Sequence, residues 1–201
     1  MFLLNALFVL AVQLKLAFAQ ETHATATIYQ VSGGVANEPI GKLYFIENNG
    51  RLTINGSLTG LPPGSHGFHI HETGSTDQGC AAAGAHYNPM QMNHGGPNDM
   101  IRHIGDLGNI QTPASGPTPI NVLDSIASLS GNFSIIGRSV VIHEKPDDLG
   151  KGGTEDSLKT GSAGARIACG VIEKYGSKTA GLLGTNVLIA IAVALFTRSI
   201  L

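Results

Sequence analysis

Short runs rich in valine, isoleucine, threonine and aromatic residues recur along the middle of the chain, separated by turn sequences such as NNG, GLPPG and GGP. Enrichment in β-branched and aromatic residues favours strands, and clusters of glycine, proline and asparagine favour turns. Between the two chain ends, no segment shows the sustained 3.6-residue period of an amphipathic helix. The pattern predicts an all-β domain of about 150 residues. Its strands are expected in the runs THATATIYQ, IGKLYFIE, RLTINGSL, HGFHIHE, NFSIIGRSVVIHE and ARIACGVI.

The segment from Cys80 to Gly108 departs from this pattern, because it is rich in glycine, proline, asparagine and aspartate and has little apolar periodicity. This composition predicts one long loop. A loop of this length in a compact domain is usually functional or disordered. Three histidines and Asp106 lie within it, and a bound metal ion would order backbone that has no core to pack against. We expect such a metal to be chiefly structural.

Seven side chains that can bind metal follow one another in an order that could assemble two adjoining sites. They are His69, His71, His86, His94, His103, Asp106 and His143. In an extended strand, residues two apart face the same side, so His69 and His71 can reach one ion. Neutral imidazole suits copper and zinc, and an aspartate with three imidazoles suits tetrahedral zinc. Any one of these histidines alone would more readily be interpreted as a hydrogen-bonded surface or core residue, so the hypothesis rests on the whole set.

The sequence around these residues reads GFHIHE, AGAHYNP, NHGGPNDM, RHIGDLGN and VVIHEKPDDLGKGG. From about Ala24 to Ile172, the chain resembles the copper/zinc superoxide dismutase family. The resemblance implies an all-β fold: an eight-stranded antiparallel Greek-key β-barrel or sandwich with long metal-binding and electrostatic loops. It also implies an enzyme that converts superoxide to oxygen and hydrogen peroxide with one copper and one zinc ion per subunit.

Carried onto this chain, the resemblance implies two ligand sets that share one histidine. Copper is assigned to His69, His71, His86 and His143, and zinc to His86, His94, His103 and Asp106. The shared ring would bind through both nitrogens and would therefore be an imidazolate. Asp147 matches an aspartate that hydrogen-bonds a copper ligand to a zinc ligand, and such partners fix ring orientation and ligand basicity. Without the resemblance, Asp147 would be one of two solvated loop carboxylates.

The same resemblance implies roles for residues around the ions. His86 would carry a proton in the half of the reaction that forms peroxide, a form of general acid catalysis. Arg166 in GSAGARIACG stands where the family places an arginine beside the copper, and a permanently charged guanidinium can bind and orient a small anion. Glu155, Asp156 and Lys159 occupy positions of the electrostatic loop. Taken alone, these three charges would indicate only an ordinary charged loop.

The chain has two cysteines, Cys80 and Cys169. The resemblance pairs them in a disulfide that joins the ligand loop to the strand following Arg166. In a chain-entropy model, closing a loop of this length adds about 4 to 5 kcal/mol to the unfolding free energy. A pair of free thiols is the alternative, but the secretory features of the chain ends favour the disulfide, because disulfides persist in oxidising compartments.

Charge excludes one class of partner. Between Gln20 and Ser177, nine lysines and arginines face fourteen aspartates and glutamates, a net charge of −5 before any metal binds. The segment has no basic stripe, so we expect no nucleic-acid partner. Superoxide is an anion, so a net-negative protein that attracts it needs positive charge focused at its site.

The two chain ends lie outside the resemblance and indicate the compartment. Residues 1–19 are apolar and end in the small-residue pattern AFA, which is typical of a cleaved secretory signal peptide. The dismutase-like domain is expected to span residues 20–175. Residues 176–201 form a spacer and an apolar tail whose uninterrupted core is shorter than a transmembrane helix needs.

We expect this tail to tether the protein to the outer cell surface. A glycosylphosphatidylinositol signal with Ser177 as the attachment residue fits the small residues, the polar spacer and the short tail. Arg198 fits the flank of a short transmembrane span instead, and we favour the lipid anchor over the span. Asn55 and Asn132 begin sequons for N-linked glycosylation, which agree with a secretory route.

Two other functions compete with dismutation for such a domain, namely metal transfer by a metallochaperone and non-enzymatic binding. A metallochaperone would need further cysteine pairs to hand over Cu⁺, and both cysteines are already assigned. A non-enzymatic binding module would have lost a copper ligand or Arg166, and all of these are present.

Thr73 and Lys174 stand at positions that are apolar dimer contacts in cytosolic relatives, and a charge weakens a dry interface. We therefore expect a weakened homodimer or a monomer.

Overall fold

The computed structural model describes residues 21–32 and 34–175. This part of the chain forms nine strands, one short α-helix and two 3₁₀ turns. In chain order they are β1 (Thr22–Ser32), β2 (Val35–Asn48), β3 (Arg51–Leu58), β4 (Gly64–His71), η1 (Ala81–Ala83), β5 (Asp106–Thr112), β6 (Thr118–Asp124), η2 (Gly131–Phe133), β7 (Ser139–His143), α2 (Ser157–Thr160), β8 (Arg166–Val171) and β9 (Glu173–Lys174). The domain is therefore mainly β, as the residue pattern predicts.

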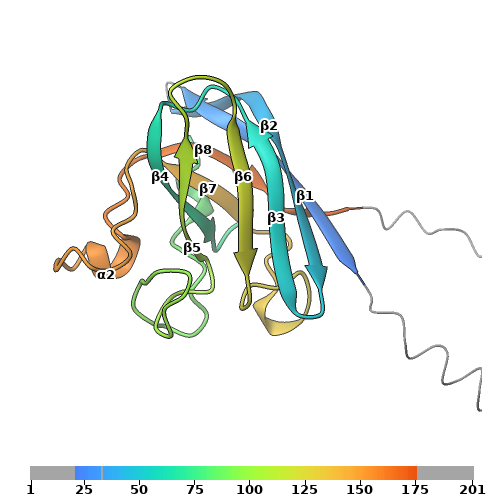
Figure 1. The fold of residues 1–201 in the computed structure, drawn as a ribbon, viewed down its shortest axis with the longest axis vertical. Helices are drawn as coiled ribbons and strands as arrows, with labels where there is room; N and C mark the ends of the chain where they lie inside the picture. Colours follow the sequence, from blue (N-terminus) through green and yellow to red (C-terminus); the bar gives the residue numbers. More distant parts are fainter. Residues whose placement is uncertain (1–20, 33, 176–201) are drawn as a thin grey trace, which may run out of the picture.

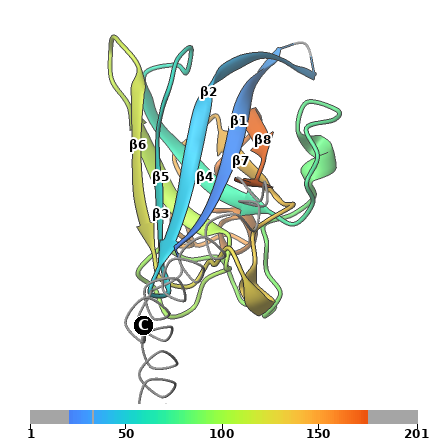
Figure 2. The same ribbon diagram turned by 90° about the vertical axis from the view of Figure 1, so that its right-hand side faces the viewer.

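Eight of the strands form one antiparallel sheet in the order β5-β4-β7-β8-β1-β2-β3-β6, and the two-residue β9 pairs with β1. The sheet curves until its two edges meet (Figures 1 and 2). There Thr112 on β5 and Thr118 on β6 share a hydrogen bond of 2.9 Å between their hydroxyl groups. The connections from β3 to β4 and from β6 to β7 join strands that are not neighbours. The expected eight-stranded Greek-key barrel is confirmed.

Side-chain alternation decides which face of each strand enters the barrel. Along β3, Leu52, Ile54 and Leu58 are buried, whereas Arg51 and Ser57 are exposed. This two-residue period is typical of a strand with one face on the core and the other in solvent. It fixes the strand register, because a slip of one residue would turn the leucines outward.

Strands β4 and β7 lack this alternation. All five residues of β7 and the last six of β4 are buried. One face of these strands packs on the core, and the other is covered by two long connections, residues 72–105 and 144–165. A layer of loops over a buried sheet face gives space for a site that is sheltered from water yet held by strands.

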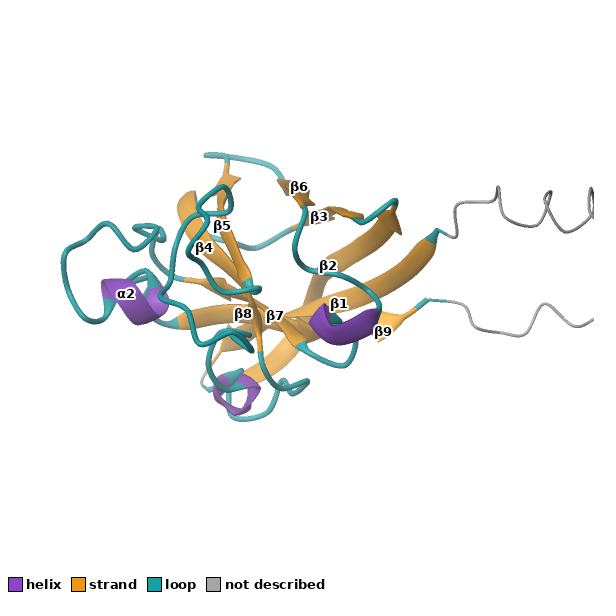
Figure 3. Cartoon of the chain, turned by 90° about the horizontal axis from the view of Figure 1, so that it is seen from below, coloured by secondary structure: helices purple, strands orange, loops and turns teal. Residues whose placement is uncertain are grey.

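The two long connections contain little regular structure (Figure 3). The predicted loop from Cys80 to Gly108 ends earlier than expected, because β5 already begins at Asp106 and includes Gly108. The helical turn α2 was not predicted, because four residues are too few to show a helical period. A disulfide joins Cys80 to Cys169 with 6.1 Å between their Cα atoms, so this expectation is confirmed.

Within residues 21–32 and 34–175, the structure contains no helix that is both long and apolar enough to cross a bilayer. The predicted signal peptide (residues 1–19), Ser177 and the apolar tail lie outside the described residues.

Candidate metal centre

Four buried histidines converge where β4 and β7 lie side by side. We call His69, His71, His86 and His143 the four-histidine cluster; one nitrogen from each ring lies within 4.8 Å of the others. His69 and His71 extend from β4 and His143 ends β7, and the antiparallel pairing of the two strands brings their rings together. His86 comes from the loop and reaches the strands through a bridge to His71.

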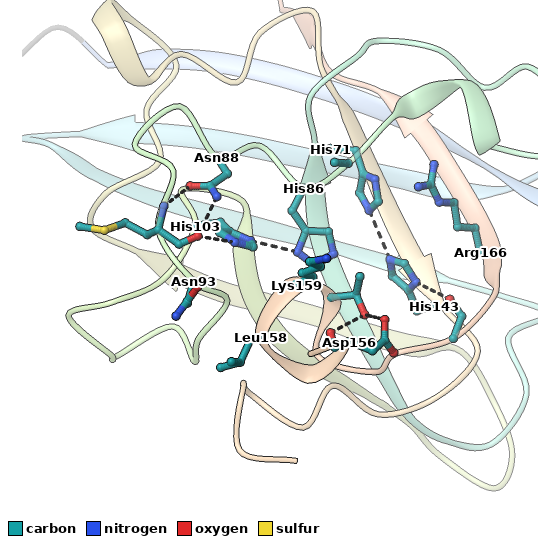
Figure 4. Close-up of a pocket in the computed structure, with 14 residues that line it drawn as sticks. His71, His86, Asn88, Asn93, His103, His143, Asp156, Leu158, Lys159 and Arg166 are labelled. Carbon is teal, nitrogen blue, oxygen red and sulfur yellow. Dashed lines mark hydrogen bonds between the residues drawn. The ribbon is translucent and has the colours of Figure 1, made fainter. Parts of the chain in front are cut away.

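A second group of donors shares His86 with the first. We call His86, His94, His103 and Asp106 the aspartate cluster. The Oδ1 atom of Asp106 lies 3.0 Å from Nδ1 of His86, 3.0 Å from Nδ1 of His103 and 2.9 Å from Nδ1 of His94. In Figure 4, His86 stands between His103 on one side and His71 and His143 on the other. One carboxylate oxygen and three imidazole nitrogens thus face a common centre.

The outer nitrogens of two rings show which way the inner ones point. His71 Nδ1–H donates to the carbonyl of Gly84 at 2.9 Å, and His143 Nδ1–H donates to the carbonyl of Gly164 at 3.1 Å. Since a neutral imidazole carries one N–H, the Nε2 atoms of both rings then present lone pairs. These two atoms lie only 3.3 Å apart. Two facing lone pairs repel each other unless a cation binds both, so the geometry fits a metal ion.

Asp147 links the two clusters. Its carboxylate accepts a hydrogen bond from Nε2 of His69 at 2.9 Å and another from Nε2 of His94 at 2.7 Å. The opposite Nδ1 atom of His69 is buried and has no hydrogen-bond partner among the described residues, and that of His94 faces Oδ1 of Asp106 at 2.9 Å. Buried polar atoms are almost always paired, and metal coordination would pair the Nδ1 atom of His69. The donor sets therefore fit the metals that the sequence predicts.

Burial keeps the four-histidine cluster uncharged. Desolvation lowers the pKa values of His69, His71 and His86. Burial, together with the charge of Arg166, lowers the pKa of His143 to about 4. The rings are therefore neutral at pH 7, which is the state that binds metal, because a protonated nitrogen has no lone pair.

The aspartate cluster has the opposite electrostatics. Burial opposes the charged form of His94, but the carboxylates of Asp106 and Asp147 outweigh it and raise the pKa of His94 to about 9. Burial also opposes ionisation of Asp106, yet hydrogen bonds from His103 and His86 hold its pKa below the usual range. In the metal-free protein, this cluster therefore carries a buried ion pair whose cation zinc would replace.

Arg166 is fixed beside the four-histidine cluster. The pairing of β7 with β8 places it opposite His143. Its Nη1 donates to the carbonyl of Cys80 at 2.6 Å, and its Nη2 donates to the carbonyl of Gly84 at 2.5 Å. The Cys80–Cys169 disulfide holds this carbonyl-bearing turn against the strand that carries Arg166. The guanidinium is thus anchored in place, whereas an exposed arginine would move freely.

A pocket of about 540 Å³ opens onto these groups. Its lining includes His71, His86, His143 and Arg166 from the centre, and Asp156 and Lys159 from the segment around α2. Glu155, the third charge expected in this segment, forms an exposed ion pair of 2.5 Å with Lys159. Positive charge and neutral imidazoles therefore meet in a space large enough for a small anion.

Comparisons with known proteins agree with this geometry. A model of the copper/zinc superoxide dismutase family (SODC) matches residues 40–172. An extracellular Cu-Zn superoxide dismutase of Caenorhabditis elegans is 54% identical over 170 residues, which cover 84% of this chain and 77% of that protein.

The chain belongs to the copper/zinc superoxide dismutase family. A second relative, an extracellular Cu-Zn superoxide dismutase of Haemonchus contortus, is 53% identical over 150 residues, covering 74% of this chain and 82% of that protein. The crystal structure of the clock protein EA4 superposes with a TM-score of 0.69 at 43% identity and covers 79% of this chain and 98% of that chain.

Copper/zinc superoxide dismutases are enzymes that use both metals, so the expected enzyme class, the dismutation of superoxide and the two cofactors are confirmed. The expected extracellular location is confirmed as well, since both relatives are extracellular. The sequence has two cysteines and both form the disulfide, which leaves none for the metallochaperone alternative.

The sequence does not reveal two residues of this dismutase that hold the main chain of Asp147 and of Asp106. Asn109 on β5 binds both sides of the Asp147 main chain: its Oδ1 accepts from Asp147 N–H at 2.7 Å, and its Nδ2 donates to Asp147 O at 2.9 Å. Arg102 is buried and donates to the carbonyl of Asp106 and to the carboxylate of Asp124. Both residues lie in or beside the string RHIGDLGN, but nothing in that string identifies their partners.

Proposed function

We propose that copper binds the four-histidine cluster, that zinc binds the aspartate cluster, and that superoxide is dismutated in the pocket beside Arg166. One observation supports this assignment above the others: His86 belongs to both clusters and also lines the pocket. Neutral imidazoles suit copper, and a carboxylate with three imidazoles suits zinc. The shared ring thus connects two metal sites to a space that substrate can enter.

When bound, copper supplies the one-electron redox couple that the reaction needs, and zinc orders the loop. The other tasks fall to side chains. Arg166 binds superoxide through its charge and orients it with its fixed N–H groups. His86 holds at Nε2 the proton that is delivered when the second superoxide becomes hydrogen peroxide. Asp147 keeps the rings of His69 and His94 in the orientation that points their Nδ1 atoms inward.

Metal content and activity of the secreted protein test these assignments together. We expect one copper and one zinc per chain and rapid dismutation. His69→Ala should remove copper and activity while zinc remains, and His103→Ala should remove zinc first. His23→Ala, which changes a histidine outside both clusters, should alter neither. A wild-type protein that binds both metals without dismutating superoxide would be the binding module and would contradict the proposal.

We also propose that the mature chain is tethered outside the cell by residues 176–201 after removal of residues 1–19. The extracellular relatives support the secretory route, and the short apolar tail supports a lipid anchor at Ser177. Phosphatidylinositol-specific phospholipase C should then release the enzyme from intact cells. Retention after this treatment would favour a short transmembrane span, and enzyme found only in the medium of untreated cells would contradict both tethers.

N-linked glycans at Asn55 and Asn132 are part of the same proposal. Asn55 is half-buried on β3 and follows the inward-facing Ile54, so it lies on the outer face of the strand, and Asn132 is exposed in η2. Both side chains are thus compatible with an attached sugar. Peptide N-glycosidase F should increase the electrophoretic mobility of the wild type, and Asn55→Gln and Asn132→Gln should each remove part of that shift.

A weakened homodimer or a monomer remains our prediction for the assembly. Thr73 and Lys174 are both exposed, and Lys174 lies on the short strand β9. A charge on this surface must lose water before a dry contact can form. Light scattering of the secreted enzyme should give a monomer mass at low concentration, and a concentration-independent dimer would contradict the prediction.

A further inference from the structure

Three main-chain hydrogen bonds close a ring between residues that adjoin the two clusters. Ile70 N–H donates to Gly105 O at 2.9 Å, Gly105 N–H donates to Tyr87 O at 3.0 Å, and Tyr87 N–H donates to Ile70 O at 2.8 Å. We call Ile70, Tyr87 and Gly105 the backbone ring. These bonds lie outside the regular pairing of the sheet, because Tyr87 and Gly105 belong to the loop between β4 and β5.

Each member of the backbone ring adjoins a metal-binding residue. Ile70 separates His69 from His71. Tyr87 directly follows His86, and Gly105 directly precedes Asp106. The ring therefore connects the four-histidine cluster to the aspartate cluster through the main chain. Since His86 is bonded to Tyr87 in the main chain, any shift of Tyr87 moves the histidine that both clusters share.

The Tyr87 side chain is held at both its face and its tip. It is buried, and the Arg138 guanidinium carbon lies 3.5 Å from the centroid of its ring. A cation over an aromatic face is attracted by the electron density of the ring. The hydroxyl group donates to the carbonyl of Asn132 at 3.1 Å. The ring of Tyr87 thus cannot shift without breaking one of these contacts.

The same arginine holds the main chain next to a second ligand. Arg138 Nη1 donates to the carbonyl of Glu72 at 2.7 Å, and its Nε donates to the carbonyl of Ser134 at 3.0 Å. Glu72 directly follows His71, which forms an isolated bridge with His86. The Arg138 guanidinium therefore restrains the chain beside His71 on β4 and, through Tyr87, beside His86 in the loop.

The close approach within the backbone ring explains the glycine at position 105. A Cβ atom there would collide with the carbonyl oxygen of Ile70 and would lie 3.1 Å from the amide nitrogen of Tyr87. Any larger residue would push the three segments apart. The three segments of the backbone ring thus lie so close together that only glycine fits at position 105.

We propose that Tyr87 is a positioning residue that, held by Arg138 and Asn132, fixes His86 between the two metal sites. Tyr87 does not line the pocket described above, so it acts through the ligand and not on superoxide. This inference rests on the proposed assignment of the two ligand sets. It makes the copper geometry depend on a side chain that touches neither metal nor substrate.

Tyr87→Leu in the copper- and zinc-loaded enzyme tests the role. We expect the paramagnetic resonance spectrum of the copper to move toward that of the zinc-free wild type, and zinc affinity to fall roughly 10- to 100-fold, the usual effect of losing a residue that supports a ligand. Tyr87→Phe keeps the ring and its cation contact. It should preserve the wild-type spectrum and keep zinc affinity within about threefold, because only one neutral hydrogen bond is lost.

Two further variants separate positioning from general stability. Ile120→Ala removes a buried side chain from β6, so it should lower the melting temperature while leaving the spectrum and zinc affinity unchanged. Arg138→Gln removes the cation and leaves the tyrosine, and it serves if Tyr87→Leu does not fold. Wild-type spectra and zinc affinity in the Tyr87→Leu and Arg138→Gln variants would overturn the inference. A wild-type enzyme that failed to bind both metals would instead contradict the proposed function.

Discussion

The four-histidine cluster and the aspartate cluster use the same kind of ligand but are built on different parts of the fold. Three members of the first come from β4 and β7, whose main chains are paired in a sheet and buried on both faces. In the second, His86, His94 and His103 come from the loop, and only Asp106 opens a strand. The first cluster is therefore positioned by the barrel, whereas the second depends on its own contacts and on metal.

This difference suits the two tasks that we propose for the clusters, redox chemistry in the first and structural metal binding in the second. A redox site benefits from ligands that move little between oxidation states, and paired strands provide this rigidity. A structural ion contributes most where the chain has few other reasons to be ordered, as in a long loop. His86 is the exception, because it is a loop residue that serves both clusters. It therefore needs additional restraint, which the backbone ring provides.

Removal of the carboxylate from the aspartate cluster should have the largest effect. Asp106→Ala takes away a proposed zinc ligand and leaves three histidines and two main-chain N–H groups without their common acceptor. We expect zinc to be lost and the unfolding free energy, measured in urea with zinc present, to fall by at least about 5 kcal/mol. Metal analysis should accompany the unfolding curve.

The matched change in the other cluster sharpens the comparison. His71→Gln removes one proposed copper ligand from β4, which is held in the sheet by its pairing with β7. Its cost in unfolding free energy should be smaller, about 1 to 3 kcal/mol, and zinc should remain bound. Equal costs for His71→Gln and Asp106→Ala would mean that the strand-borne cluster is no more independent of metal than the loop.

Loss of the disulfide should have the second largest effect on stability. The disulfide joins the loop, which has few other contacts to order it, to the barrel strand β8. Replacement of Cys80 and Cys169 by serine should lower the unfolding free energy by about 4 to 5 kcal/mol in the chain-entropy model. Dismutation should fall as well, since Arg166 donates to the carbonyl of Cys80. Unchanged activity in the folded double variant would show that the other carbonyl contacts suffice to hold the arginine.

The sequence predicts the strand-borne part of this centre far better than the loop-borne part. The two-residue spacing of His69 and His71 already places both on one side of a strand, and β4 has them there. The contact between Tyr87 and Arg138 joins segments far apart in the chain, and no residue pattern identifies such a partner. Asp106 was expected in a loop because polar and glycine neighbours obscure the beginning of β5.

The two clusters should also respond in opposite directions to pH in the metal-free protein. The pKa of His94 is raised from 6.5 to about 9, so its stabilising contribution is complete below pH 6.5 and is lost as the pH rises through 9. The pKa of His143 is lowered from 6.5 to about 4, so the protein loses stability as the pH falls from 6.5 to 4. We expect metal-free stability to be greatest near pH 6.5.

Urea unfolding of the metal-free protein at several pH values measures this. Each shift corresponds to at most about 3.4 kcal/mol. His94→Gln should flatten the curve on the alkaline side only, and His143→Gln should flatten it on the acid side, where the other buried histidines still contribute. A maximum well above pH 8 in the wild type would contradict the proposed charge on His94.

The smallest effect is expected from a change beside the rigid cluster that leaves every ligand in place. Arg166→Lys keeps the positive charge, but a single ammonium group cannot donate to Cys80 O and Gly84 O in the arrangement that the forked guanidinium allows. Metal content and melting temperature should stay close to wild type, while the rate constant for dismutation falls roughly tenfold, or about 1.4 kcal/mol. Arg51→Lys, the same substitution at an exposed position on β3, should leave the rate unchanged. If Arg166→Lys lowered zinc content as well, a change beside the four-histidine cluster would disturb the aspartate cluster. The two clusters would then not be independent of each other, and the contrast between them would fail.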